Sequence, residues 1–226
     1  MSRAASAARF LTQGTRLPPA KWEQAVEGIL GQPETSACSL QRGLSLGSYR
    51  TAWRMARIIR EAMQAVEWPL LSGEVELCDV NLAPRGRATK SIWLAIERRR
   101  ISGGLIRGWR DSHNFRADLR CIVTALDPDA KVITSPSGLF RELKTLGFRQ
   151  RSEPLGTNDA LPAAAAVAIA FRRMLQARRH HGLATATLDL YLGEFVFRHN
   201  AAALGWEPAE QRRRVLAALR APRLSA

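Results

Sequence analysis

Acidic side chains and one thiol alternate along a short apolar run in the first half of the chain. The run carries Glu74, Glu76 and Cys78, and Asp79 follows. Because successive side chains of a strand point to opposite faces, a strand here places the first three on one face and Asp79 on the other. Mg²⁺ requires oxygen ligands, and a thiol is the wrong type for it. Glu76 lies two residues, about 6–7 Å, from Cys78 along the same face.

The cysteines and histidines add little further chemistry. No Cys-x-x-Cys pair occurs, which excludes a zinc ribbon, and the odd number and wide spacing of Cys38, Cys78 and Cys121 predict reduced thiols. No histidine is adjacent to Cys78 to activate it, so we expect a buried core residue there. His180 and His181 are neighbours and cannot share one face of a helix. We therefore expect no bound metal and no cofactor.

The charge of the chain points to a partner. Lys and Arg total 34 against 20 Asp and Glu, which gives a formal net charge of +14 and a pI near 11.2. Such a balance favours a polyanionic partner, either nucleic acid or an anionic membrane surface, although an Arg-rich coding background produces it too. The most apolar stretch, residues 161–171, is too short to span a bilayer. We therefore expect a cytoplasmic, nucleoid-associated protein that binds no membrane.

Helical periodicity dominates the first part of the chain, after an expected flexible arm at residues 1–19. The pattern predicts helices at residues 21–31, 36–44 and 49–66, and Ser48 would cap the third. A short helix, a turn that contains Gly47 and a longer basic helix form a helix-turn-helix arrangement, whose second helix enters the DNA major groove. Arg57 and Arg60 would extend the basic face towards phosphates. An ordinary three-helix bundle with a solvated basic face fits this spacing equally well.

The pattern changes after Pro69 to short β-rich runs and further helices. Strands are expected at residues 74–80, 91–98, 104–109, 131–134 and 148–152. Helices are expected at residues 114–126, 139–146, 162–179 and 188–202, and a basic helix follows from Pro208. This order predicts an α/β fold with a mixed sheet, and it is the ribonuclease-H-like order.

Several sequence blocks together resemble one known family. The blocks TRLPPAKW (residues 15–22), YRTAWRMARIIREAM (49–63), GEVEL (73–77), HHG (180–182) and LDLYLGEFVFRHN (188–200) occur in this order. They are similar to the bacterial insertion-sequence transposases of the family numbered fifteen-ninety-five, which are relatives of the eukaryotic Merlin elements in the DDE superfamily. The resemblance spans residues 12–200. It implies a helix-turn-helix followed by a ribonuclease-H-like domain.

The departures from that family concern its catalytic residues. The resemblance implies a catalytic Asp on the first strand, where this chain has Cys78, and a second Asp after the fourth strand, where it has Ser135. The third metal-binding position falls within residues 163–166, and we assign it to Ala165. A lysine on the same helix is replaced by Arg173. The resemblance also implies a four-cysteine zinc ribbon before the first shared block, and we expect none here, because the chain begins too close to that block.

These observations define the expected domains and contacts. We expect an arm (residues 1–19), a helix-turn-helix domain (20–68), a ribonuclease-H-like transposase-type domain (69–203) and a basic C-terminal helix (204–226). The residues expected to contact DNA are Ser48, Tyr49, Arg50, Thr51, Arg54, Arg57, Arg85, Arg87, Arg173, Arg212, Arg213 and Arg214.

The expected function is DNA binding by a domesticated, catalytically inactive transposase that acts as a regulator, an architectural factor or a complex subunit. Two Mg²⁺ ions bridged by carboxylates are needed for phosphodiester cutting, and the family's acids are absent. A homodimer or a larger nucleoprotein assembly is compatible with this role. Two alternatives stay open: a protein-interaction module that pairs with an active transposase or another partner, and a transposase with a rearranged metal site.

Overall fold

The structure is a computed structural model that describes residues 17–32, 35–82, 91–98, 104–112, 114–134, 138–154, 161–177 and 185–221. The chain divides into two units. Unit 1 lies within residues 1–67 and 205–226, and unit 2 comprises residues 68–204. Unit 2 is thus inserted into unit 1 along the chain, and each unit is described by itself.

Unit 1 is helical. It contains α2 (Pro19–Gly31), α3 (Ala37–Gly43), α4 (Tyr49–Gln64) and α9 (Pro208–Arg220). Apolar side chains at helical spacing form its buried core. They include Trp22, Val26 and Ile29 of α2 and Met55, Ile59 and Met63 of α4. The helices predicted at residues 21–31, 36–44 and 49–66 are confirmed to within a few residues.

Helix α9 belongs to unit 1 and is not the separate basic helix that we expected at residues 204–226. It packs against both α2 and α4. Its Val215 and Leu216 are buried, because they form an apolar stripe that covers the other helices. Unit 1 is therefore built from both ends of the chain.

Polar contacts also connect the helices of unit 1. The Lys21 ammonium donates a hydrogen bond to the carbonyl of Leu44. Arg60 is only 7% exposed, and its guanidinium donates to the carbonyl of Thr35 at 3.1 Å. The Thr35 hydroxyl in turn donates to the carbonyl of Gly28 at 2.9 Å. The prediction that Arg60 reaches phosphates is therefore wrong, because its charge is used inside the unit.

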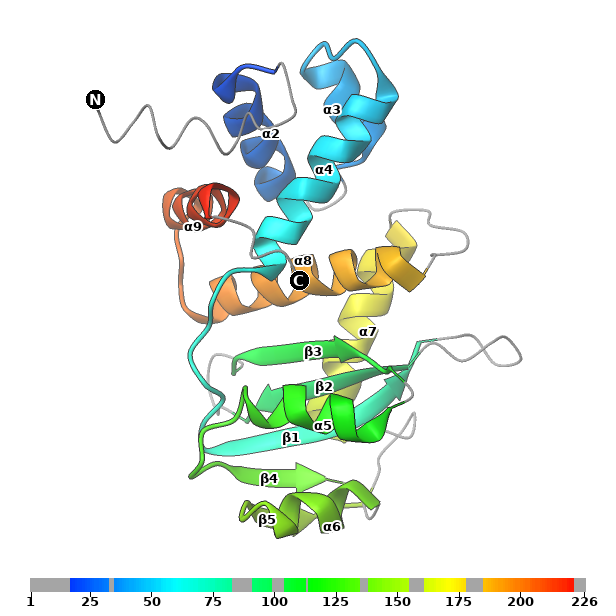
Figure 1. Cartoon of the computed structure of the whole chain (residues 1–226), viewed down its shortest axis with the longest axis vertical. Coiled ribbons are helices and arrows are strands. Elements are labelled where there is room, and N and C mark those ends of the chain that lie inside the picture. Colours follow the sequence, from blue (N-terminus) through cyan, green and yellow to red (C-terminus); the bar gives the residue numbers. More distant parts are fainter. Residues whose placement is uncertain are drawn as a thin grey trace. The chain divides into compact units, whose positions relative to one another are not determined.

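Unit 2 contains a five-stranded mixed sheet (Figure 1). Its strands are β1 (Glu74–Asn81), β2 (Ser91–Glu97), β3 (Ile106–Arg110), β4 (Lys131–Thr134) and β5 (Arg149–Ser152). They lie in the order β3-β2-β1-β4-β5. The pairs β1–β2 and β2–β3 are antiparallel, whereas β1–β4 and β4–β5 are parallel. The predicted α/β class with a mixed sheet is confirmed.

Helices cover both faces of this sheet (Figure 1). They are α5 (Phe115–Val123), α6 (Gly138–Thr145), α7 (Pro162–Ala177) and α8 (Thr185–Ala203). On one face Cys78 and Val80 pack with residues of α7 and α8. On the other face Val75 and Leu77 pack with residues of α5 and α6. This alternation along β1 is the one expected from the sequence.

Helix α8 fixes the edge strand β3. The Asn200 amide accepts a hydrogen bond from the N–H of Ile106 at 2.8 Å and donates to the carbonyl of the same residue at 3.0 Å. The helix approaches so closely that a Cβ atom at Gly108 would lie 2.8 Å from the side chain of Leu192. The block at residues 188–200 therefore serves to pack α8 on β3. Within the part of the chain that the structure describes, no helix has the length and apolarity needed to cross a membrane.

Candidate nucleic-acid interface and sheet-face charge cluster

Local sequence fixes where α4 begins. Ser45 has a φ of 49°, which turns the chain after α3, and Ser48 accepts a hydrogen bond from the N–H of Thr51 at 3.2 Å. The hydroxyls of Ser48 and Thr51 also lie 2.9 Å apart. The N-cap predicted at Ser48 is confirmed. Both side chains, expected to contact DNA, are engaged in this cap.

Exposed aromatic and basic side chains occupy the outer face of α4. Tyr49 is 51% exposed and Trp53 is 48% exposed. Arg50, Arg54 and Arg57 are exposed as well. At about 100° per residue, these five positions span about 140° of the helix circumference, and the buried apolar residues of α4 lie outside this arc. We call these five residues the α4 outer face.

The charges of the α4 outer face differ in their partners. The Arg57 guanidinium donates through Nε to Glu61 Oε1 at 2.8 Å, and it lies 5.8 Å from the centre of the Trp53 ring. Arg50 and Arg54 take part in no hydrogen bond or ion pair with the residues that the structure describes. Two arginines are thus free to meet an anion, and a third is oriented over an exposed indole.

The arginines of α9 are held by acids of the same unit. Arg212 contacts Glu23 at 3.0 Å and Glu27 at 2.9 Å. Arg213 and Arg214 contact Glu210 at 2.6 and 2.7 Å, and the hydrogen bond from Arg213 is the main reason why the pKa of Glu210 falls to about 2. These three arginines were expected to contact DNA. Any such contact would compete with their present partners.

In unit 2, the face of β1 that meets α7 carries a buried carboxylate. Glu76 is 1% exposed. Its Oε1 accepts from Arg98 Nε at 2.6 Å, and its Oε2 accepts from the N–H groups of Ala163 and Ala164 at 2.9 and 3.0 Å. The carboxylate therefore caps the start of α7, where unpaired N–H groups favour a negative charge.

Arg98 links Glu76 to further charged groups. Its guanidinium donates to both oxygens of Glu153, at 3.1 and 2.6 Å, and these bonds are the main reason why the pKa of Glu153 falls to about 2. Arg151 contacts Glu153 and lies 3.7 Å from Glu74, which also binds Lys131 at 2.8 Å. We call this group the sheet-face cluster. It consists of Glu74, Glu76, Arg98, Lys131, Arg151 and Glu153.

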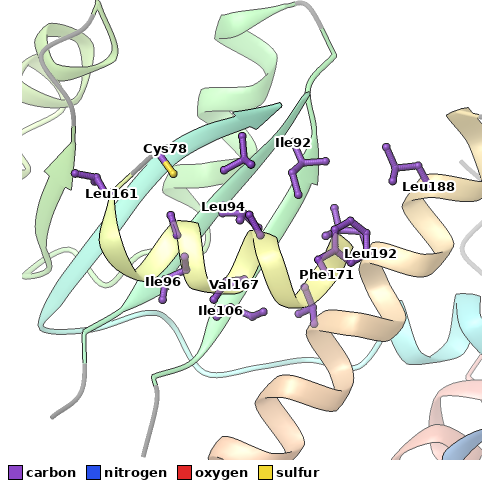
Figure 2. Packing of buried hydrophobic residues seen from close by; sticks show 14 of the residues in the cluster. Cys78, Ile92, Leu94, Ile96, Ile106, Leu161, Val167, Phe171, Leu188 and Leu192 are labelled. Atoms are coloured by element: carbon purple, nitrogen blue, oxygen red, sulfur yellow. The ribbon is translucent and has the colours of Figure 1, made fainter. Parts of the chain in front are cut away.

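Cys78 lies next to this cluster, at the position where the resemblance implies a catalytic Asp. It is 4% exposed, and burial raises the pKa of its thiol to about 12. Figure 2 shows it beside Leu161, at the start of α7. Ala165, on α7, is partly buried against the apolar cluster of side chains to which Cys78 belongs. Positions 78 and 165 therefore both belong to the apolar packing between β1 and α7, whereas Ser135 lies outside the described residues.

These side chains do not fit a pair of Mg²⁺ ions. Both oxygens of Glu76 already accept hydrogen bonds, the Cys78 thiol stays protonated, and Ala165 offers no ligand atom. The sheet-face cluster also balances its acids with basic groups, so it lacks the excess of anionic oxygen that a divalent cation requires. Among the described residues, no group of three or more His, Cys, Asp and Glu side chains is arranged to hold a metal.

Three further arginines were expected to contact DNA, and the structure describes one of them. Arg173 is exposed on α7, in unit 2, and Arg85 and Arg87 lie outside the described residues. Sequence reasoning missed Trp53 on α4 and Arg98 at the end of β2. The sequence did hint at a residue such as Arg98. Glu76 lies in an apolar run, and an acid that is buried there needs a basic or hydrogen-bonding partner.

Comparisons with known proteins add little to this description. No protein-family model matches the sequence, and no curated protein matches it. One solved structure with a detected likeness is a chain in a cryo-EM structure of the simian T-cell lymphotropic virus intasome in complex with PP2A regulatory subunit B56 gamma. The sequence identity is 9% and the TM-score is 0.37, and the match covers 74% of this chain and 64% of that one. A likeness at this TM-score carries no argument about this chain.

Proposed function

We propose that this chain binds duplex DNA through α4 and that it derives from a transposase which has lost its cutting chemistry. The α4 outer face carries the proposal. Its arginines Arg50 and Arg54 are exposed and have no partner among the described residues, and they lie on the first two turns of the helix. In a helix-turn-helix, the corresponding part of the second helix faces the base edges of the major groove.

The sheet of unit 2 supports the proposed ancestry. A ribonuclease-H-like sheet has three antiparallel strands followed by two parallel ones, and the order β3-β2-β1-β4-β5 agrees with this arrangement. Cys78 lies on β1 at the place where the resemblance puts the first catalytic acid. The proposal therefore assigns unit 2 to the scaffold of a DDE-type transposase.

The sheet-face cluster supports the proposed loss of cutting. Two-metal cleavage needs carboxylates that bridge both ions. In this chain the buried acid Glu76 caps α7 and pairs with Arg98 instead. We propose that the scaffold keeps its shape through this ion pair while it holds no catalytic ions.

A salt titration of DNA affinity tests the proposal. The observed association constant should fall with a slope of about −0.9 per neutralised phosphate on a log–log plot, so three contacts weaken binding about 40-fold between about 50 and about 200 mM salt. A fluorescently labelled random-sequence duplex and anisotropy measurements suffice. Absence of binding at the lowest salt concentration would refute the proposal.

A pair of variants locates the interface. The double variant Arg50→Ala/Arg54→Ala should bind at least about tenfold more weakly, because each lost contact is worth about 1 kcal/mol or more. The matched control is Arg116→Ala/Arg120→Ala, which removes two exposed arginines from α5 in unit 2. Equal losses in the two double variants would show that binding follows net charge and not the α4 outer face.

A further inference from the structure

The aromatic half of the α4 outer face is not explained by packing or by phosphate binding. Tyr49 and Trp53 are the exposed aromatic side chains among the described residues, and they are one helical turn apart. The chain buries Trp22 of the same unit to 3% exposure. An indole left about half exposed between arginines is typical of a contact surface, since aromatic residues are enriched where partners bind.

The neighbours of Trp53 favour DNA as the partner over another protein. Arg50, Arg54 and Arg57 lie beside it on the same face, and Glu61 is the one acid between residues 36 and 66. Glu61 binds Arg57 Nε at 2.8 Å and so helps to hold the guanidinium over the indole. The surface presented around the ring is therefore cationic, which complements a phosphate backbone.

The major groove offers one apolar group to such a ring. Each base pair presents hydrogen-bond donors and acceptors there, and only thymine adds a methyl group, at C5. Arginine side chains pair with the O6 and N7 atoms of guanine in the same groove. We propose that Trp53 reads thymine methyl groups, next to guanines read by Arg50 or Arg54, and that Glu61 positions Arg57 beside it. This inference rests on the proposed DNA binding by α4.

A thymine-to-uracil exchange tests this contact atom by atom. A duplex is first selected with the wild-type protein from a random library, and each thymine in the selected site is then replaced by uracil, which removes only the C5 methyl group. At one or two positions the wild-type protein should bind the uracil duplex about three- to fivefold more weakly, as expected for one buried methyl group.

The same pair of duplexes is then measured with Trp53→Ala. If the indole contacts the methyl group, the thymine-to-uracil ratio should fall to about one in this variant, because coupled partners are not additive. The control variant is Leu146→Ala, which removes an apolar side chain of 52% exposure from unit 2 and should leave the ratio unchanged. Thermal unfolding of both variants checks that the fold is intact.

The outcomes separate this inference from the proposed function. Thymine reading would be overturned if uracil had no effect at any position, or if wild type and Trp53→Ala had the same thymine-to-uracil affinity ratio. Salt-dependent binding in either case would leave the proposed DNA binding intact. The inference would also be overturned if Trp53→Ala lost more affinity for single-stranded oligonucleotides than for duplex DNA. That result would indicate stacking on unpaired bases, which needs no methyl group. Absence of all DNA binding would remove both proposals together.

Discussion

Glu76 shows at the scale of a single residue how this chain holds a buried acid in place. Its carboxylate is buried, yet each oxygen has a partner, because Arg98 meets one side and the first N–H groups of α7 meet the other. A buried charge is tolerated only with such pairing. The sequence could predict which face Glu76 occupies, but its partners lie 22 and 87 residues away, beyond any local pattern.

Removal of Arg98 should therefore be costly. Arg98→Met leaves Glu76 buried without its cation, and we predict a loss of roughly 3–5 kcal/mol in the free energy of unfolding. Arg151→Met is the matched control, since that side chain is 44% exposed and surface pairs contribute at most about 1 kcal/mol. Urea unfolding measures both variants. Equal losses would contradict the account of Glu76.

Glu153 should give the stability of unit 2 an acid-dependent component. Its pKa is about 2 in the folded chain and 4.5 in its ordinary state, so the folded state favours the charged form. The resulting stability is present above about pH 4.5 and is lost as the pH falls towards about 2.

The comparison of Glu153→Gln with the wild type measures this component. The variant should show a flatter dependence of the urea midpoint on pH between about 4.5 and about 2. Glu142→Gln, at an exposed position on α6, should follow the wild-type curve. Parallel curves for wild type and Glu153→Gln would contradict the assigned role of Arg98.

At the scale of elements, local signals predicted boundaries well. Ser48 marked the start of α4, and the strand predicted at residues 131–134 coincides with β4. Local signals did not predict that α9 returns to α2 and α4, because that packing depends on residues near both chain ends. They also did not show that Arg60 is buried, because a charged residue in a helical pattern is expected to be exposed.

The contact between α8 and β3 should depend on Asn200. Asn200→Ala leaves the N–H and the carbonyl of Ile106 without these partners in a buried site, and we predict a loss of at least about 2 kcal/mol in the free energy of unfolding. Asn114→Ala removes only an N-cap of α5 and should cost about 1 kcal/mol. A loss at Asn200 no greater than that at Asn114 would argue against this role.

At the scale of the whole molecule, the insertion of unit 2 makes unit 1 depend on the C-terminal helix. A chain that ends at residue 204 lacks Val215 and Leu216 from the core of unit 1, as well as the contacts of Arg212 with Glu23 and Glu27. We predict that amide hydrogens of α2 and α4 exchange much faster in this truncated chain, while those of β1 and β2 keep their protection. Unchanged protection in α2 and α4 would show that α9 is dispensable.

The central claim is that the chain holds DNA without cutting it, and one experiment tests both halves. Supercoiled plasmid is incubated at low salt with the full chain and either Mg²⁺ or Mn²⁺, and the DNA is run on a gel before and after removal of the protein. The account predicts a retarded complex that returns entirely to the supercoiled band. Nicked or linear plasmid that depends on the metal ion, or a plasmid never retarded, would contradict it.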